Sequence, residues 1–352
     1  MPRLCIAVAD EMLAAALGLV SAGRQLSPQE TLRFREQRYR DGNSVYPAWY
    51  LFGCKAKAVN GMVEIYRRQG AEVFLCPASL LEKTIAAEII DTQFCSLPEP
   101  LFSAWQENGL TVLGYLPVTY AAKTCQAKAL QASGGARFLP LQQSYTKNSI
   151  PRLPAAGRPV WLVKSAYGAA GRNRDGTPYT VWQQEYLQEK LPSLLARLPA
   201  GEELICSEFV FACDPYAAYA DHVVHKMHFL ACPGKVPVPY GRYCQRFIHR
   251  CNHALLQQKK VVTLGEFIGQ PQVSSGTIDS ITAFDDFAGC LAFLAGRVIF
   301  SVDFIVPQDG VPRFLEINKL AGTFAETFEP SLPPLIDYYA GLPLAAEGNK
   351  LA

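Results

Sequence analysis

The sequence predicts an α/β protein whose last part is an antiparallel sheet, and two observations carry this prediction. In the first third of the chain, short apolar runs at 4–9, 72–76 and 111–113 are separated by helical patterns. Strands that alternate with helices indicate a small parallel sheet. Near the end, two apolar runs at 298–306 and 313–318 flank an Asp309-Gly310 turn. That turn is typical of an antiparallel hairpin, so the later strands form a different kind of sheet.

Composition excludes several classes of protein. The 352 residues are 49% apolar and 18% charged, which fits two or three globular domains and excludes a disordered chain. The net charge of +2 gives no basic excess, so we expect no nucleic-acid partner. No run of eighteen apolar residues is free of charge, so we expect no membrane partner. Asp10 and Glu11 interrupt the apolar start, which we interpret as a buried strand and not as a signal peptide.

Cysteine usage points to a reducing compartment. There are 11 cysteines, an odd number, and no CxxC pair occurs. A secreted protein of this size more often pairs its cysteines, so free thiols in a cytoplasmic protein are expected.

The first elements can be justified in chain order. A helix over 59–69 ends at Gly70 and carries Arg67 and Arg68 in its last turn. No GxGxxG loop follows the first strand, so a dinucleotide site is not expected there. A second helix, over 120–133, stops at Gly134-Gly135.

The later elements begin with a strand at 159–165 and a glycine-rich loop over 165–176. After them we expect a helix at 182–195, strands at 204–212 and 223–231, helices at 253–262 and 284–294, and the two hairpin strands. No internal repeat and no low-complexity run interrupts this order.

The hairpin carries the most informative chemistry. Because strand side chains alternate, Ser301, Asp303 and Ile305 are expected on one face of the first strand. Phe314, Glu316 and Asn318 are expected on one face of the second. Asp303, Glu316 and Asn318 would then meet, and their oxygens suit Mg²⁺, which also binds phosphate oxygens. Three polar residues facing water are the alternative, but the surrounding strands are strongly apolar, and a buried carboxylate needs a partner.

Two lysines and a glycine-rich loop suggest phosphate binding. Lys164 ends an apolar strand, and the loop after it contains Ser165, Tyr167, Gly168 and Gly171. Glycines let backbone N–H groups approach phosphate oxygens, and a lysine adds positive charge. The loop is not a P-loop, since no GKS or GKT follows. Lys123 opens the second helix and by itself would be an ordinary surface lysine.

The strand at 204–212 can supply an adenine site. Its end contains Glu208, Phe209, Val210 and Phe211, whose backbone groups can meet an adenine edge while apolar side chains meet its face. Asp214 follows closely enough to reach a ribose. Taken alone, Glu208 could equally be a charge at a strand end.

Taken together, these parts resemble the ATP-grasp superfamily of ATP-dependent carboxylate ligases, which includes D-alanine–D-alanine ligase. The resemblance covers about the last two-thirds of the chain, from Lys123 to Thr323, with the parts in the family order. It implies ATP bound by Lys123, Lys164, the glycine-rich loop as a flexible lid, the segment from Glu208 to Phe211, and Asp214. It also implies Mg²⁺ or Mn²⁺ held by Asp303, Glu316 and Asn318.

The chain departs from the family pattern in two places. Many relatives carry an arginine two residues before the metal-binding aspartate, where this chain has Ser301. In those relatives the arginine contacts the acyl phosphate, and in this chain we expect Arg242, Arg246 or Arg250 to do so instead. Arg246 and Arg250 would share a face if their segment is helical. After Asn318 the chain reads Lys-Leu-Ala-Gly-Thr, not the Pro-Gly turn of many relatives.

The resemblance implies an ATP-grasp fold in three parts. An N-terminal α/β domain covers 1–118, a lid domain 119–200, and a C-terminal domain with the metal site 201–352.

A histidine cluster suggests zinc, but its spacing argues against this. All five histidines lie between His222 and His253. His222 and His228 share a strand face but stand ~20 Å apart, too far to share an ion. We therefore expect a substrate-side strand, with His225 or Lys226 near the phosphates.

The function implied is an ADP-forming ligase that activates a small-molecule carboxylate as an acyl phosphate and joins it to an amine. A thiol or carrier-protein acceptor, a homodimer, and a non-catalytic ATP-binding module stay open as alternatives. An α/β oxidoreductase is disfavoured by the missing glycine motif.

Overall fold

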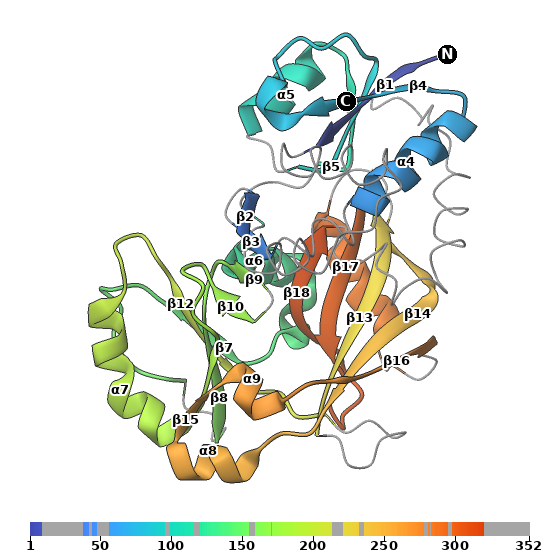
Figure 1. Cartoon of the computed structure of the whole chain (residues 1–352). Helices are drawn as coiled ribbons and strands as arrows, with labels where there is room; N and C mark the ends of the chain where they lie inside the picture. The colour runs from blue at the N-terminus through green and yellow to red at the C-terminus, as the bar shows by residue number, and fades with distance from the viewer. Residues whose placement is uncertain are drawn as a thin grey trace, which may run out of the picture.

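The computed structural model describes residues 1–8, 38–41, 44–47, 56–95, 99–115, 120, 122–154, 159–169, 171–212, 221–231, 236–277, 281, 283–294 and 298–319. Their strands form three larger sheets, which Figure 1 shows in blue at the top, in green at the lower left and in yellow to red at the lower right.

The first sheet is parallel, as the sequence predicts. Its strands, in the order β4-β1-β5-β6, are β4 (Glu72–Pro77), β1 (Arg3–Val8), β5 (Ile89–Phe94) and β6 (Thr111–Leu113). Two helices accompany it, α4 (Ala56–Arg68) and α5 (Glu99–Glu107), with a short 3-10 turn at Ala78–Leu80. Helix α4 buries Val59, Met62 and Tyr66, whose helical spacing places them on one face. Strand β5 and helix α5 have no counterpart in the sequence prediction.

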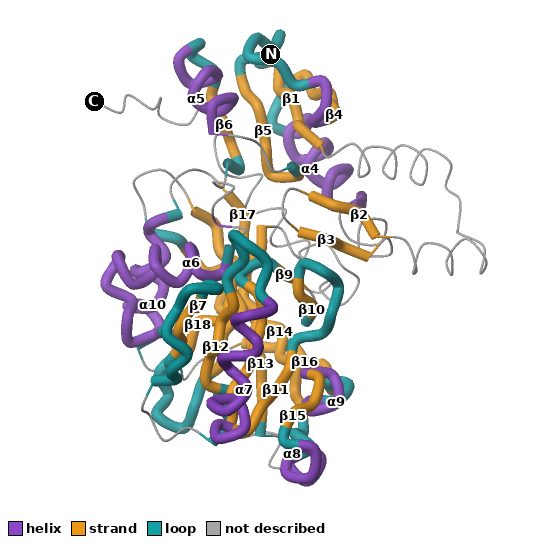
Figure 2. The backbone as a smooth tube through the Cα atoms, turned by 90° about the vertical axis from the view of Figure 1, so that its left-hand side faces the viewer, coloured by secondary structure: helices purple, strands orange, loops and turns teal. Residues whose placement is uncertain are grey.

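The second sheet is antiparallel in the order β15-β11-β8-β12-β7. Its strands are β7 (Gln142–Tyr145), β8 (Val160–Ser165), β11 (Thr180–Gln183), β12 (Leu204–Glu208) and β15 (Val261–Thr263). Helix α7 (Gln184–Arg197) packs on one face through Leu187, Leu191 and Leu195 (Figure 2). Helices α8 (His253–Lys259) and α9 (Leu264–Ile268) pack on the other. Between β12 and β15 the chain runs through two strands of another sheet, so it leaves this sheet after β12 and returns to it at β15.

The third sheet is antiparallel in the order β16-β14-β13-β17-β18. Its strands are β13 (His222–Ala231), β14 (Val238–His249), β16 (Gln272–Thr277), β17 (Val298–Ile305) and β18 (Arg313–Lys319). A core of aromatic and aliphatic residues joins one face to helices α6 (Lys123–Leu130) and α10 (Phe284–Gly289). A π-helical turn (Gln131–Gly135) and 3-10 turns at Ala136–Phe138 and Cys290–Phe293 extend these helices. The opposite face of this sheet carries Lys226, Asp303 and Glu316, which belong to the candidate site.

Two small hairpins lie near this face. One joins β9 (Gly168–Ala169) to β10 (Arg172–Asn173), and the other joins β2 (Arg38–Asp41) to β3 (Ser44–Pro47). Strand β3 lies beside β9 (Figure 1).

Two predicted helices are shorter than expected. The helix expected over 253–262 ends at Lys259, because Lys260 takes a left-handed conformation with φ 64°. The β-branched residues that follow, Val261, Val262 and Thr263, pair with β11 instead. The helix expected over 284–294 is α10 followed by the 3-10 turn at Cys290–Phe293.

A third difference concerns the face of Phe314. Between β17 and β18 the register shifts, so Asp303 lies opposite Glu316 while the next residue, Phe304, lies opposite Phe314. This bulge turns Phe314 into the core that also holds Ile317. The prediction that Phe314 shares a face with Glu316 is therefore wrong.

Among the described helices, none combines the length and the apolar character that a bilayer span requires.

Candidate functional site

The site is centred on the two carboxylates of the hairpin. Asp303 and Glu316 are direct cross-strand partners, as the turn and the alternation predict. The Asn318 side-chain amide donates to Oε1 of Glu316 at 3.1 Å, so all three predicted oxygen ligands lie on one surface. Hard oxygens in this arrangement are the donor set that Mg²⁺ prefers.

Lys123 connects this surface to the glycine-rich loop. Its Nζ lies 2.7 Å from Oε2 of Glu316 and donates to the backbone oxygen of Gly168 at 2.7 Å. Its backbone N–H donates to the oxygen of Ala166 at 2.9 Å. Burial lowers the pKa of Lys123, but Glu316, and after it Tyr179, more than reverse this, so the pKa is raised and the ammonium stays charged.

Gln126 fixes the helix that carries Lys123. Its side chain accepts from the N–H of Ile317 at 2.8 Å and donates to the oxygens of Ile317 at 3.2 Å and Tyr120 at 2.7 Å. Because β18 is an edge strand, Ile317 would otherwise leave its backbone groups without a strand partner. Gln126 takes the place of the missing strand and sets the position of Lys123 beside Glu316.

Lys164 is close enough to Lys123 for their charges to interact. The pKa of Lys164 is lowered to about 8, chiefly by burial and also by the positive charge of Lys123, with partial compensation by Glu316. The two lysines therefore face one region of the molecule, as the ATP-grasp resemblance implies.

Lys226 is the third cation of the site. It lies opposite Asp303 across β13 and β17, with its Nζ 3.0 Å from Oδ1. The pKa of Asp303 is raised to about 6, chiefly by burial and in part by the charge of Glu316, although the charge of Lys226 opposes this rise. Burial also acts to raise the pKa of Glu316, but Lys123, together with Lys164 and Asn318, outweighs it and lowers that pKa to about 2.

The glycine-rich loop forms the hairpin β9–β10 above these lysines. Gly168 has no room for a side chain, since a Cβ there would lie 2.3 Å from the oxygen of Arg172 and 2.5 Å from the Tyr179 hydroxyl. Gly171 turns the hairpin with φ 71°. Ser165 starts the loop, and its N–H donates to Asn173 Oδ1 at 2.7 Å. The Tyr167 ring lies 5.8 Å from the guanidinium carbon of Arg174.

The expected adenine segment leaves the second sheet at Glu208. Oε1 of Glu208 accepts from the N–H of Leu141 at 3.0 Å, so this carboxylate fixes the neighbouring chain. Phe209 is buried and contacts the rings of Phe211 and His222 at 5.1 Å and 4.5 Å. The backbone oxygen of Val210 lies 3.0 Å from His222 Nδ1. Asp214 lies outside the described residues.

The three candidate arginines lie along β14 and just beyond it. The segment is a strand and not a helix, so the helical argument for Arg246 and Arg250 does not apply. Arg246 is half-buried and lies opposite His225, whereas Arg250 is exposed after the strand ends. The backbone of Arg242 is in β14, and its side chain lies outside the described set.

His225 and Lys226 point to opposite faces of β13. His225 stacks on Phe304 with the ring centroids 5.4 Å apart, so it packs toward the core while Lys226 faces the carboxylates. Of these two candidates for the phosphate region, only Lys226 reaches the site.

Sequence reasoning misses Gln126 and Tyr179 altogether. Neither stands in a recognisable motif, and each acquires its role only through contacts with distant strands. The weak signal for Gln126 is its position one helical turn after Lys123.

No protein-family model matches the chain. Solved structures resemble it at low sequence identity. A D-alanyl-alanine synthetase A from Vibrio cholerae is 10% identical with a TM-score of 0.53, over 98% of this chain and 96% of that one. A D-alanine-D-alanine ligase from Coxiella burnetii is 12% identical with a TM-score of 0.48, over 97% and 95%. An ATP-grasp ligase complexed with a minimal precursor is 16% identical with a TM-score of 0.48, over 80% and 94%. The likeness to the D-alanyl-alanine synthetase A, with a TM-score above 0.5, shows the fold, so the predicted ATP-grasp fold is confirmed.

Proposed function

We propose that the chain is an ATP-dependent ligase that joins a small-molecule carboxylate to an amine and releases ADP and phosphate. The observation that carries the proposal is the meeting of Lys123 and Lys164 with the carboxylate pair of Asp303 and Glu316. Cations to bind phosphates and oxygen donors to bind a metal are the two requirements of phosphoryl transfer.

The charge of the site fits a nucleotide triphosphate bound with a metal ion. Three ammonium groups and two carboxylates leave the site with a small positive excess. An anionic triphosphate would compete for Lys123 and Lys226 and release the carboxylates, which then need a cation. The donor set of Asp303, Glu316 and Asn318 fits Mg²⁺, or Mn²⁺ in its place, and such an ion supplies neutralisation of phosphate charge.

Each part of the chain has a distinct task in this proposal. Lys123 and Lys164 bind the phosphates next to the nucleoside, while the hairpin at Gly168 covers them and excludes water. The segment from Glu208 to Phe211 binds adenine between backbone groups and aromatic rings. Tight positioning is the main catalytic contribution, because no nucleophilic side chain is needed.

The reaction then has two steps. A substrate carboxylate oxygen forms a bond to the γ-phosphorus, the bond to the ADP oxygen breaks, and ADP leaves. The amine attacks the acyl carbon of the resulting acyl phosphate, phosphate leaves with the bonding electron pair, and the amine loses a proton to solvent. We assign to Lys226 the role of stabilising the transferred phosphoryl group, because its ammonium group lies 3.0 Å from Asp303.

A substrate-pair screen tests the proposal. Purified protein is incubated with ATP, Mg²⁺ and pooled amino acids or small acids paired with amines, while ADP release and product mass are measured. Asp303→Asn and Glu316→Gln should reduce ADP release by several orders of magnitude, since each removes a charged metal donor. Glu189→Gln, an exposed carboxylate on α7, is the matched control and should behave as wild type.

Two outcomes would contradict the ligase assignment. ATP binding without ADP release for any carboxylate would indicate a binding module. ADP release that survives in well-folded Asp303→Asn and Glu316→Gln variants would place the chemistry elsewhere. Product mass also separates an amine acceptor from a thiol acceptor.

A further inference from the structure

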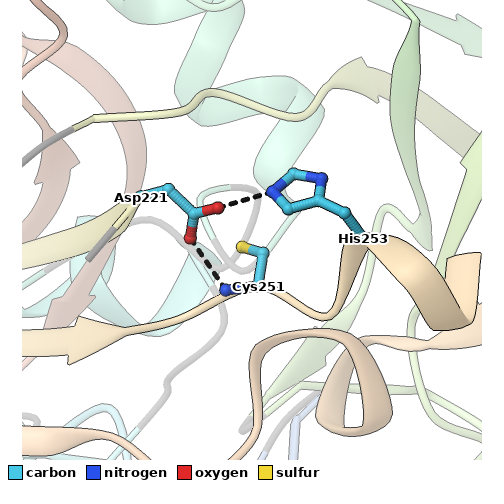
Figure 3. Close-up of side chains that lie close together, drawn as sticks. All are labelled: Asp221, Cys251 and His253. Carbon is cyan, nitrogen blue, oxygen red and sulfur yellow. Dashed lines mark hydrogen bonds and ion pairs between the residues drawn. The ribbon is translucent and has the colours of Figure 1, made fainter. Parts of the chain in front are cut away.

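A second cluster of metal-ligating side chains lies away from the carboxylate pair. Asp221 precedes β13, Cys251 follows β14, and His253 is the first residue of α8. Figure 3 shows the three side chains close together, with Cys251 and His253 from one segment of the chain and Asp221 from another. One ligand atom from each, a carboxylate oxygen, the Cys251 sulfur and a His253 ring nitrogen, lie within 4.8 Å of one another.

We propose that Asp221, Cys251 and His253 form a binding site for a thiophilic divalent cation of the zinc type. This inference does not depend on the proposed ligase function, because it concerns different residues and a different class of metal ion.

The ligand types and their spacing fit such an ion. Zinc is bound in proteins by cysteine sulfur, histidine nitrogen and carboxylate oxygen at distances of about 2.0–2.3 Å, usually with tetrahedral geometry. Tetrahedral ligand atoms at those distances are about 3.3–3.7 Å apart. The side chains of the cluster therefore need only small shifts to surround one ion.

A backbone hydrogen bond and ring packing already orient two of the three ligands. Oδ1 of Asp221 accepts from the N–H of Cys251 at 2.7 Å, which leaves Oδ2 directed at Nε2 of His253. The His253 ring packs between Phe211 and Phe267, with centroid distances of 5.3 Å and 5.6 Å. Supporting contacts of this kind fix ligand geometry in metal sites and strengthen binding.

Exposure provides an entry route. The His253 side chain is 49% exposed and the Asp221 side chain 30%, whereas Cys251 is 7% exposed. An ion can therefore approach from the solvent side, with water in the fourth position, while the thiol contributes from within the protein.

A hydrogen-bonded anchor without metal accounts for Asp221 and His253, and the Cys251 side chain packs in the apolar core beside them. The argument for an ion is the combination of a carboxylate oxygen, a cysteine sulfur and an imidazole nitrogen within 4.8 Å of one another, since these are the three donor types that zinc binds in proteins.

The location predicts what the ion does. Asp221 begins a strand of the third sheet, and its backbone oxygen accepts from the N–H of Ala212 at 3.0 Å. His253 begins the helix that leads the chain back to the second sheet, and it contacts Phe211 of the expected adenine segment. A bound ion would join these segments at the junction of the two sheets and stabilise the folded state by mass action.

The test uses the tag-free, full-length protein and two probes, Co²⁺ and Zn²⁺. We expect one equivalent of Co²⁺ to give a thiolate-to-cobalt charge-transfer band in the near ultraviolet. We also expect Zn²⁺ to displace it and to raise Tm, with reversal by a chelator. Cys251→Ser should remove the band, and His253→Gln should weaken Zn²⁺ binding by at least about tenfold.

Controls keep the result specific to this cluster. Cys290→Ser, a half-buried cysteine next to α10, should leave the band and the affinity unchanged. Cobalt bound by Asp303 and Glu316 would give no thiolate band, so the two sites are distinguishable. The proposal is overturned if wild-type protein gives no band, or if both the band and the affinity persist in Cys251→Ser and His253→Gln.

Discussion

Gln126 provides the sharpest test of how the site is assembled. Replacing it with leucine, of similar volume, removes three hydrogen bonds at 2.7, 2.8 and 3.2 Å. The N–H and C=O of Ile317, a residue only 4% exposed, then lose their partner at the edge of the sheet. Leaving a buried polar group unsatisfied costs about 1–3 kcal/mol, so with partial relief by water we expect a loss of about 3 kcal/mol in unfolding free energy.

The activity loss should be larger than this destabilisation alone explains. Gln126 lies on the same helix as Lys123, and its bonds to Ile317 hold Lys123 against Glu316. A displacement of about 1 Å in a positioned group can reduce a rate about 10²-fold. We therefore expect Gln126→Leu to reduce the rate of ADP release by about 10²-fold at temperatures where the variant is fully folded.

A matched control separates positioning from general destabilisation. Gln188 on α7 also makes a bidentate contact with the backbone, to the N–H of Leu153 at 2.8 Å and the oxygen of Pro151 at 2.9 Å. Urea unfolding and ADP release are measured for Gln126→Leu and Gln188→Leu under the same conditions. Equal loss of activity in both variants, or near-wild-type stability and activity in Gln126→Leu, would refute the positioning argument.

Three further predictions follow from the same geometry. Lys226→Met should reduce kcat by about 10²–10³-fold with a smaller effect on ATP affinity, while Lys226→Arg recovers part of the rate; equal losses in kcat and affinity would contradict its assignment. Because the pKa of Lys164 is lowered to about 8 and bound phosphate favours its charged form, ATP affinity measured by calorimetry should fall about tenfold per pH unit above about pH 8. A flat profile in wild type, or the same fall in Lys164→Arg, would exclude Lys164 as the cause. Gly168→Ala should weaken ATP binding, because its Cβ would overlap the oxygen of Arg172, whereas Gly265→Ala, with open space around it, should bind ATP normally.

The parts of the site that the sequence predicts are those set by local rules. Strand alternation and the Asp309-Gly310 turn are sufficient to place Asp303 opposite Glu316. The same rule fails one step further along, at Phe314, because a bulge depends on how two strands pair and not on either strand alone.

Other features depend on contacts between distant segments, which no single sequence reveals. Gln126 and Ile317 are 191 positions apart, and nothing in either local pattern links them. Asp221 and His253 are 32 positions apart, so they match none of the short ligand spacings that identify zinc motifs in a sequence. The segment around Arg246, for which a shared face with Arg250 is conditional on a helix, is a strand, because pairing with β13 and β16 decides its backbone conformation.

Lys123 links the elements of the site, and its bonds limit how the glycine-rich loop can move. Its backbone N–H is bonded to Ala166, its ammonium to Gly168 and Glu316, and its helix to Ile317 through Gln126. A motion that lifts the whole loop would have to break the bonds at both Ala166 and Gly168. A motion of the hairpin beyond Gly168, about the turn at Gly171, breaks neither of them. We therefore expect any closing motion of this site to involve the residues of the β9–β10 hairpin beyond Gly168, with Lys123 staying beside the carboxylates.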